Sequence, residues 1–559
     1  MDDKKELIHR VPRDLLIGLG EFVGVSGMVA DGIVVRISNA LFKSSLAKNA
    51  KPVFSQKIAK FEMKFGEKWV IWGGGKGQLL DVIANKYLCD PPLSLEYGKT
   101  RRKAPHVELM AFKGVIPTAH LSARYEHFKD EFDQSCKKFI LDNAIGSNAV
   151  SYDVSTTDRK VDMALYDELV EELKLSELQD RWAMGLSNGQ MRRARLAYSL
   201  LKEPDILLVD DPFLGLDSTA ASIISKFLAN YQNKRRCSVT IGLRIQDVIP
   251  QWCTHVCCVD EREGILFQGP INELQDEINS MRQRYELEAQ RNSSSSRYQV
   301  DDLVASHPMF RKPQHEVLKM PSTIELKGLE VKYKGSPVLQ DLHWNVKPGS
   351  KWHIQGDNGS GKSTLLSLIT AEHPQSWNRK VIEQGRPRKT GSSNYFDINK
   401  RIGMSSPEIH AIVLKNAARD LNIKEMIATG FHDASSNNFQ PLWNQLNDDK
   451  KLLIDMYINH FNLQDLAQTH RFNQLTVSNQ KLVLFIRSLI KMPQILILDE
   501  AFSGMERGAM MLCQELLEAW PGSVLVVSHV AEETPRCDHY LRLVGPGNYK
   551  IGQISHDKN

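Results

Sequence analysis

Short apolar runs separated by helical patterns recur along this chain in a fixed order. Residues 206–210 and 495–499 each have the pattern of a buried strand of large aliphatic residues that ends in acidic residues. In both places a helical pattern follows, and then another apolar run, at residues 238–243 and 523–528. Strands that alternate with helices predict an α/β fold with its ligand at the carboxyl ends of the strands.

These runs belong to an internal repeat. Residues 67–73 resemble residues 350–356, and Trp69 and Trp352 occupy matching places in the two segments. Both tryptophans precede a glycine-rich turn at strand spacing, so we expect their side chains to lie in the core. The chain is therefore predicted to contain one unit twice, which we call the first and the second cassette.

The repeat divides the chain into four predicted regions. Residues 1–30 form an extension with little order, residues 31–274 the first cassette, residues 275–320 a linker and residues 321–559 the second cassette. The linker combines a charge-dense helical pattern with a serine-rich tract. We interpret it as a solvated connection in preference to a partner-binding arm.

A glycine-rich turn in the second cassette matches the phosphate-binding pattern G-x-x-x-x-G-K-[ST], between a strand and a helix. Glycines let backbone N–H groups turn toward an anion, the lysine adds a positive charge, and the serine hydroxyl suits Mg²⁺. The residues expected to bind nucleotide here are Gly356, Asp357, Asn358, Gly359, Ser360, Gly361, Lys362, Ser363 and Thr364.

Two carboxylates end the buried strand of the second cassette. Asp499 suits Mg²⁺ held through water, and Glu500 can polarise an attacking water. Together with the phosphate-binding turn they predict a site for ATP and Mg²⁺.

The segment Leu186-Ser187-Asn188-Gly189-Gln190 in the first cassette resembles the LSGGQ signature of ATP-binding cassette (ABC) proteins. Two phosphate loops, two acidic strands and a terminal Ser528-His529 extend the resemblance over nearly the whole chain. Within that family the chain is similar to soluble twin-cassette ATPases without membrane spans. These are uncharacterised fungal twin cassettes and a bacterial photorepair or molybdate-operon type.

The resemblance implies two tandem P-loop nucleotide-binding domains of the α/β class, each with a mixed-sheet core, an antiparallel β part and a helical subdomain. It implies that the cassettes pack head to tail, with ATP between the phosphate loop of one and the signature of the other. Lys362, Glu500 and His529 would then be catalytic, and Ser363 and Asp499 would hold Mg²⁺. The other implied ATP contacts are Tyr333, Ser187, Asn188, Gly189, Gln190 and Asp217.

The first cassette departs from the family pattern in its own phosphate site. Its loop is shorter by three residues and lacks the Ser-Thr pair, Asp211 stands where a glutamate is expected, and Arg244 stands where a histidine is expected. We expect this site not to turn over, and Phe42 would stand in for Tyr333 as its adenine-stacking residue. The residues of this degenerate site are Gly75, Lys76, Gly77, Asp210, Asp211 and Arg244.

The second cassette departs elsewhere. Its signature segment, residues 475–479, has lost both glycines, and Pro407 or Glu408 occupies the place of a metal-contacting glutamine. The intact loop and the intact signature thus belong to opposite cassettes, and head-to-tail packing would join them. The sequence predicts one hydrolytic composite site and one site that is structural or empty; the alternative is a non-hydrolysing, ATP-dependent scaffold.

Composition adds few constraints. The chain has 559 residues, with 71 basic and 67 acidic residues and a net charge of +4, which does not argue for nucleic acid. Eight cysteines occur without metal-site spacing and predict reduced thiols. The sequence has no run of about 18 apolar residues, so it predicts no membrane span. We expect a cytoplasmic protein, with a mitochondrial presequence beginning near Met28 as the alternative.

The partner stays open at this point. We expect a monomer in which the two cassettes pair within the chain and act on an unknown macromolecular partner. One alternative is the ATPase subunit of a transporter, with a separate membrane subunit docked near the inserts at residues 98–150 and 405–445. The other is a ribosome- or nucleic-acid-associated factor, which the mixed linker charge and the broken site disfavour.

Overall fold

The computed structural model describes most of the chain. The described ranges are residues 32–45, 51–98, 105–111, 133–145, 161–234, 237–294, 300–333, 336–357, 359–389, 391, 394–417, 420–432 and 438–555. The predicted extension at residues 1–30 lies outside them, as do Asn358 and most of the insert at residues 98–150.

Each cassette is built on a six-stranded sheet, and the two sheets have the same strand order. In the first cassette the order is β10 (Gly264–Pro270), β9 (His255–Asp260), β3 (Trp69–Trp72), β8 (Ser238–Leu243), β7 (Ile206–Asp210), β6 (Val107–Met110). In the second it is β20 (Asn548–Gln553), β19 (His539–Gly545), β13 (Lys351–Gly356), β18 (Ser523–Val527), β17 (Ile495–Asp499), β16 (Ile402–Ser405). The strand before each glycine-rich turn is central and pairs in parallel with both neighbours.

An antiparallel sheet accompanies each core sheet. In the first cassette it contains β1 (Ile33–Lys43), β2 (Ile58–Lys64), β4 (Leu88–Asp90) and β5 (Leu95–Tyr97), and in the second β11 (Ile324–Tyr333), β12 (Ser336–Val346), β14 (Val381–Glu383) and β15 (Arg386–Pro387). Phe42 on β1 is 2% exposed and packs in the core of the first cassette. The expectation that it stacks on adenine is wrong, because a buried ring offers no face to a ligand.

The duplication extends to single side chains. Trp69 stacks on His255 with ring centroids 4.9 Å apart, and Trp352 stacks on His539 at 4.7 Å. Both tryptophans are buried, as predicted, and both come from the central parallel strand. The two halves therefore share their packing as well as their strand order.

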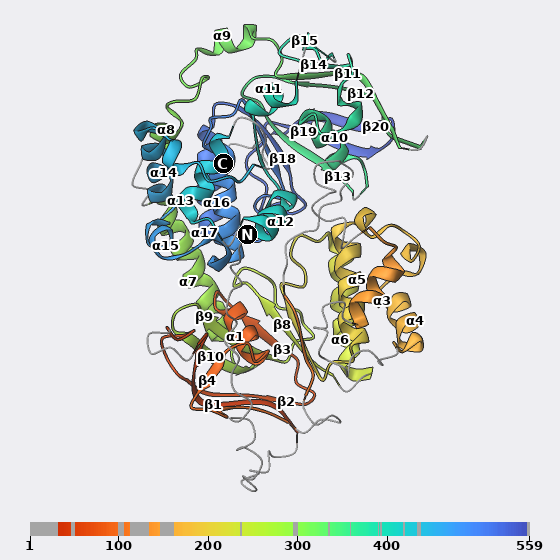
Figure 1. Ribbon diagram of the computed structural model, residues 1–559, viewed down its shortest axis with the longest axis vertical. Coiled ribbons are helices and arrows are strands. Elements are labelled where there is room, and N and C mark those ends of the chain that lie inside the picture. The colour runs from red at the N-terminus through yellow and green to blue at the C-terminus, as the bar shows by residue number, and fades with distance from the viewer. Residues whose placement is uncertain are drawn as a thin grey trace, which may run out of the picture.

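Helices cover the sheets and form a separate group in each cassette (Figure 1). Those of the first are α1 (Lys76–Ile83), α3 (Cys136–Ile145), α4 (Met163–Glu172), α5 (Asn188–Leu201) and α6 (Ser218–Lys234). Those of the second are α10 (Lys362–Ile369), α11 (Tyr395–Lys400), α12 (Pro407–Asn416), α13 (Ile423–Ala428), α14 (Asp448–His460), α15 (Gln464–Thr469), α16 (Val477–Leu489) and α17 (Arg507–Ala519). Among the described residues, no helix is both long and apolar enough to cross a bilayer.

The linker contains α7 (Gln275–Ser294), α8 (Val300–Val304) and α9 (Gln314–Lys319). Ile278 of α7 is buried in the first cassette, and Leu303 of α8 is buried in the second. In Figure 1, α7 passes from the lower to the upper cassette and meets α17. The interpretation of the linker as solvated is therefore wrong for the face of α7 that packs on the cassettes. A few apolar side chains among many charges suffice to anchor the helix there.

The two cassettes contact each other at α12 and at the loops that follow their acidic strands. Ala411 and Ile412 of α12 are buried together with the core residues of the first cassette. Gly504 lies against Leu214, since a Cβ built at Gly504 would be 3.0 Å from Leu214 Cδ2. Leu214 and Gly504 lie in matching loops, each after the acidic strand of its own cassette, so the repeated segments meet each other.

Candidate functional site

The glycine-rich turn of the second cassette has the backbone shape of an anion nest. Gly356, Gly359 and Gly361 have φ values of +147°, +87° and +99°, a region that L side chains rarely adopt. Gly361 caps α10, whose first-turn N–H groups have no carbonyl partner within the helix. The turn thus combines the backbone shape of an anion nest with a helix N-terminus.

Two polar side chains of this turn have no hydrogen-bond partner outside the turn among the described residues. Lys362 Nζ folds back onto the turn, where it donates to the carbonyl oxygens of Gly356 (2.6 Å) and Asp357 (3.0 Å). Ser360 Oγ is buried and makes no hydrogen bond to any described residue. Burial lowers the pKa of Lys362, while Asp499, Glu500, Asp357 and Asp217 raise it. A positive charge and an unsatisfied hydroxyl beside a nest fit a polyphosphate.

The acidic strand places Glu500 directly beside this turn. Glu500 has φ +45°, outside the usual range for its residue type, and its N–H donates to the Val527 carbonyl at 2.9 Å. Its Oε1 lies 3.6 Å from His529 Nε2. Its Oε2 is buried and makes no hydrogen bond to any described residue, which leaves one carboxylate oxygen available to a ligand or water.

The pKa values of this pair are shifted in opposite directions. Burial, and then the neighbouring Asp499, raise the pKa of Glu500 to about 8, although Lys481 and Lys362 oppose the shift. Burial and the positive charge of Lys362 lower the pKa of His529. At neutral pH the contact is therefore between a neutral imidazole and a carboxyl group that is poised to lose its proton.

Charged groups of the first cassette reach this site. Burial lowers the pKa of both Lys362 and His529, and the negative charge of Asp217 opposes that shift, while Glu500 interacts electrostatically with Arg192 of α5. Asp217 is fixed at the start of α6, where its Oδ1 accepts from Ala220 N at 2.7 Å. Residues from opposite halves of the chain thus act electrostatically on the same groups.

The predicted signature lies at the N-terminus of α5. Ser187 Oγ accepts from Gln190 N (3.3 Å), and Gln190 Oε1 accepts from Ser187 N (2.9 Å), so both side chains cap their own helix. A Cβ at Gly189 would lie 2.7 Å from Ala220 Cβ, so only glycine fits against α6. The helix N-terminus that carries Ser187 and Asn188 is thereby held rigidly beside Asp217.

The shorter turn of the first cassette does not form the same nest. Gly73 N donates to the Leu243 carbonyl (3.0 Å) and Gly75 N to the Val259 carbonyl (2.9 Å), so these amides are used within the fold. A Cβ at Gly74 would touch Glu261, whose carboxylate lies over the turn. An acidic side chain therefore packs against this turn.

The lysine of this turn is neutralised by carboxylates. Lys76 Nζ lies 2.5 Å from Asp210 Oδ1 and 2.8 Å from Asp211 Oδ2, and all three side chains are largely buried. Burial alone would lower the pKa of Lys76, but Asp211 and Asp210 raise it well above its ordinary value. Gly77, which replaces the metal-binding serine, is the second residue of α1. Neither the cation nor the base position is free for a nucleotide.

Protein contacts close this side of the interface. Arg244 Nη1 and Gln246 Nε2 donate to the Met505 carbonyl at 3.2 and 2.9 Å, and Arg507 N donates to Gln246 Oε1 at 3.0 Å. Tyr285 of the linker helix accepts from Arg507 N at 3.1 Å. The loop after the acidic strand of the second cassette is therefore bound by the first cassette and the linker.

Two of the predicted contacts lie at the limits of the described residues. Tyr333 ends β11, but its side chain is outside the described part, and so is Asn358. At the position expected to hold a metal-contacting glutamine, Pro407 and Glu408 begin α12, and Ser406 Oγ caps the helix by accepting from Ile409 N at 3.2 Å. A helix start thus replaces the glutamine.

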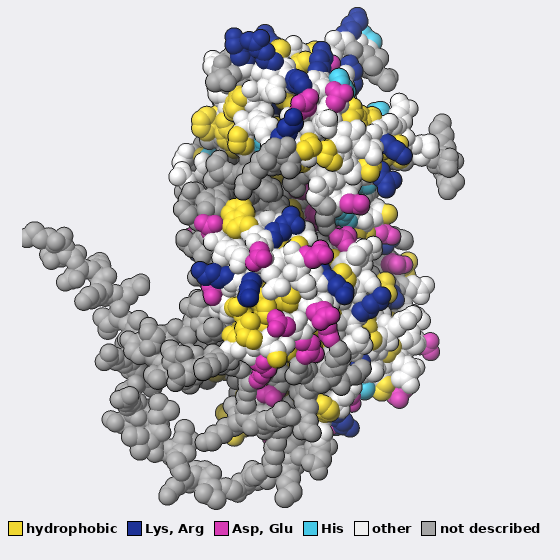
Figure 2. Space-filling view, turned by 90° about the vertical axis from the view of Figure 1, so that its right-hand side faces the viewer, with side chains coloured by type: hydrophobic (Ala, Val, Ile, Leu, Met, Phe, Trp, Pro, Cys, Tyr) yellow, Lys and Arg dark blue, Asp and Glu magenta, His cyan; other side chains and the backbone are white. Residues whose placement is uncertain are grey.

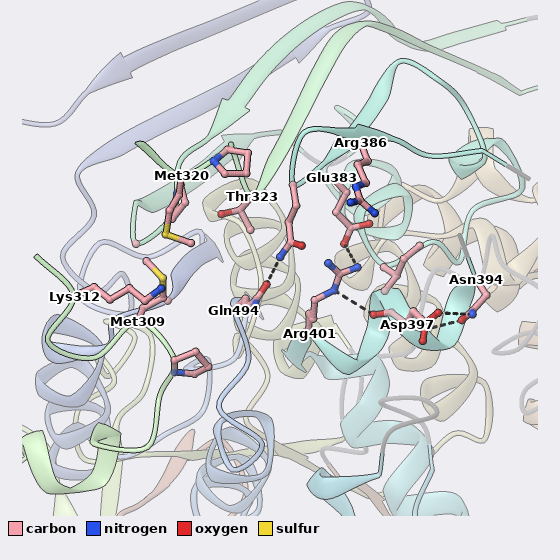
Figure 3. A pocket seen from close by; sticks show the side chains of 17 residues that line it. Met309, Lys312, Met320, Thr323, Glu383, Arg386, Asn394, Asp397, Arg401 and Gln494 are labelled. Atoms are coloured by element: carbon pink, nitrogen blue, oxygen red, sulfur yellow. Dashed lines mark hydrogen bonds and ion pairs between the residues drawn. The ribbon is translucent and has the colours of Figure 1, made fainter. Parts of the chain in front are cut away.

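A polar pocket of about 580 Å³ lies elsewhere on the second cassette (Figure 3). Gly349, Arg401, Gln494 and Gly522 line it, each close before a parallel strand, so the pocket is at the amino ends of the strands. Inside it, Arg401 Nη2 lies 3.4 Å from Glu383 Oε1, as Figure 3 shows. The phosphate turn follows the carboxyl end of β13, so this pocket is not the nucleotide site.

Comparison with known proteins decides the family. The model of the family described as "ABC transporter" matches residues 57–214 and 339–503, more than half of the chain and both cassettes. The chain belongs to the ABC family. It therefore has two ABC nucleotide-binding domains and is an ABC ATPase, as the sequence resemblance implied.

Three curated ABC relatives match over most of their length. A Saccharomyces cerevisiae protein named "Uncharacterized ABC transporter ATP-binding protein YDR061W" is 62% identical over 94% of this chain and 100% of its own length. A Schizosaccharomyces pombe protein, "Uncharacterized ABC transporter ATP-binding protein C323.04", is 28% identical over 87% of this chain and 93% of its own. The Escherichia coli "ABC transporter ATP-binding protein ModF" is 29% identical over 88% and 94%. The predicted likeness to fungal and bacterial twin cassettes is confirmed.

Several residues around the two ABC sites were not found from the sequence. Glu261, Gln246 and Tyr285 come from a strand end, a loop and the linker, and their residue types carry no motif. One signal was available in the second cassette, where His353 and Gln355 interrupt the apolar pattern of the strand before the phosphate turn. Polar residues on a central strand indicate a local task.

Proposed function

We propose that this ABC protein hydrolyses ATP at one composite site, made by the phosphate turn of the second cassette and the signature of the first. The observation that carries the proposal is the contrast between the two lysines: Lys76 is held by Asp210 and Asp211, whereas Lys362, among the described residues, donates to carbonyl oxygens of its own turn. Asp217 of the first cassette contributes charge to the intact site.

The residues of the composite site have distinct roles in this proposal. Gly356, Asp357, Asn358, Gly359, Ser360, Gly361, Lys362 and Thr364 bind the phosphates, Tyr333 the adenine, and Ser187, Asn188, Gly189 and Gln190 the γ-phosphate from the opposite side. Ser363 and Asp499 would hold Mg²⁺. When bound, this ion offsets the negative charge of the β- and γ-phosphates.

Glu500 and His529 act on the proton and on the phosphate. In its ionised form, Glu500 accepts a proton from the attacking water through its buried Oε2, which makes no hydrogen bond to any described residue. The raised pKa makes this carboxylate a stronger base than an ordinary one. His529, neutral because its pKa is lowered, donates a hydrogen bond toward the γ-phosphate while remaining 3.6 Å from Glu500. Burial on closure excludes other water from the reacting atoms.

The degenerate site, at the phosphate turn of the first cassette, serves as a structural contact between the cassettes. Its amides are used by the fold, its lysine is neutralised, and the loop at Met505 and Arg507 is bound by Arg244, Gln246 and Tyr285. Glu261 lies over the turn, and burial followed by the charge of Glu506 raises its pKa to about 7. A phosphate at this place would meet carboxylates, so the site holds no nucleotide.

Binding stoichiometry and turnover together test the proposal. The Glu500→Gln variant should bind one ATP per chain, and Lys362→Ala in the same background should bind none at the same ATP concentration. Turnover should require Lys362 and Glu500. Two ATP molecules per chain, or full turnover in Lys362→Ala, would contradict a single composite site.

We further propose that closure acts on a macromolecular partner. A membrane subunit is the second candidate for this partner, because the three relatives are named as ABC transporter ATP-binding proteins. A nucleic acid is not favoured: on the face shown in Figure 2, basic and acidic side chains are intermixed over the described residues. Co-purification of Glu500→Gln with an integral membrane protein, retained in detergent and lost in Lys362→Ala, would favour the membrane subunit.

A further inference from the structure

Two polar side chains on the central strand of the second cassette connect to the segment that carries His529. His353 Nε2 lies 3.3 Å from the carbonyl oxygen of Ser528, and Gln355 Nε2 lies 3.0 Å from His353 Nδ1. Both side chains come from β13, two residues apart, and therefore point to the same face of the sheet. Ser528 directly precedes His529.

The partners fix the state of the His353 ring. A carbonyl oxygen can only accept, so His353 Nε2 carries the proton and donates it to Ser528. Nδ1 then has a lone pair and accepts from the Gln355 amide. Burial lowers the pKa of His353, which keeps the ring in this neutral form at neutral pH. The chain of contacts runs from Gln355 through His353 to the backbone of Ser528.

In the first cassette the matching backbone carbonyl has a different hydrogen-bond donor. Val70 and Trp72 stand at the positions of His353 and Gln355, and both are fully buried. The carbonyl that matches Ser528 belongs to Leu243, and it accepts from the Gly73 amide of the phosphate turn at 3.0 Å. In the degenerate site, the turn itself holds this carbonyl. In the intact site a side chain does so.

We propose that His353 is a positioning residue for ATP hydrolysis. This inference rests on the proposed function. His353 holds the Ser528 carbonyl and so fixes the backbone from which His529 projects toward Glu500. His529 Nε2 is 3.6 Å from Glu500 Oε1, a distance that a shift of the preceding peptide would change directly. Gln355 acts through His353 by maintaining the tautomer that donates.

The test compares two substitutions of the same residue. His353→Leu removes the donor, whereas in His353→Gln the amide nitrogen reaches about as far as the ring Nε2 and can still donate. We expect kcat to fall about fivefold to tenfold in His353→Leu, the loss expected for one hydrogen bond, with ATP affinity changed less than twofold. His353→Gln should recover at least half of the wild-type kcat. His343→Leu, on the exposed part of β12, is the control.

Three results would overturn the inference: an unchanged kcat in His353→Leu, an equal loss in the leucine and glutamine variants, or a change confined to ATP affinity. If His353→Leu does not fold, Gln355→Leu takes its place, with an expected loss in kcat of about twofold to threefold, and an unchanged kcat there also contradicts the inference. The proposed function fails separately, if wild-type turnover does not depend on Lys362.

Discussion

Lys76 Nζ lies 2.8 Å from Asp211 Oδ2, so the phosphate-site lysine of the first cassette is paired with the residue at the position of the catalytic base. Asp210 binds the same amine at 2.5 Å. In the second cassette the matching lysine, Lys362, donates to carbonyl oxygens of its own turn and to no carboxylate in the described part of the chain. The same fold thus uses one lysine for an internal ion pair and leaves the other for a ligand.

The two lysines should differ in their effect on turnover. Lys362→Ala should abolish ATP hydrolysis, because it removes the cation of the phosphate site. Lys76→Ala should keep most of the turnover per folded molecule but lose about 3 kcal/mol of stability, since it leaves two buried carboxylates unpaired. The double change Lys76→Met with Asp211→Asn leaves one unpaired carboxylate, Asp210, instead of two, and should be less destabilising. Comparable loss of turnover from both lysine changes would contradict the asymmetry.

The raised pKa of Glu500 predicts a pH-dependent stability. The pKa of Glu500 in the folded protein, about 8, lies above its ordinary value, so ionising Glu500 costs folding free energy. The contribution of the protonated carboxyl to stability is fully present below about pH 4.5 and is lost as the pH rises through 8. Glu500→Gln carries no such penalty. Its Tm should exceed that of the wild type by about 2–4 °C or more at pH 8, with a smaller difference at pH 5. Thermal unfolding of both proteins across this range, in the absence of nucleotide, measures the effect, and a difference that does not vary with pH would refute it.

The degenerate site should resist repair of its catalytic residues. In a Lys362→Ala background, Asp211→Glu together with Arg244→His restores the expected base and histidine of the first cassette. ATP hydrolysis should stay absent, because the amides of Gly73 and Gly75 remain bonded to Leu243 and Val259. Recovery of turnover would show that the side chains, and not the backbone of the turn, disable this site.

The linker helix should contribute to the closed side of the interface. Tyr285→Phe removes a hydroxyl that bonds to both Gln246 and Arg507, and should lower the free energy of unfolding by about 1 kcal/mol with little change in kcat. Tyr540→Phe, on β19 at the far side of the second sheet, is the control and should have a smaller effect. Chemical denaturation followed by tryptophan fluorescence measures both. An unchanged stability in Tyr285→Phe would remove the linker from the account.

The sequence predicted the features that depend on local pattern. The strands at Ile206–Asp210 and Ser238–Leu243 have the predicted bounds, because continuous aliphatic runs between turns have few other structures. The packing of α7 was missed, since a single buried residue such as Ile278 does not alter a charge-dense pattern. The pairing of Lys76 with Asp210 and Asp211 was also missed, because it joins residues more than a hundred positions apart and no motif describes it.

The central claim is that surviving parts of opposite cassettes form one site, and a matched pair of cap substitutions tests it most directly. Ser187 Oγ and Thr476 Oγ1 each cap a signature helix by accepting from a backbone N–H at 3.3 Å, so Ser187→Ala and Thr476→Ala should cost similar stability, about 1 kcal/mol. The measurement is kcat for ATP hydrolysis in the two variants. We expect a loss of at least about tenfold in Ser187→Ala, since one contact to the γ-phosphate is removed, and less than a twofold change in Thr476→Ala. Equal losses in the two variants, or a larger loss in Thr476→Ala, would contradict the composite site.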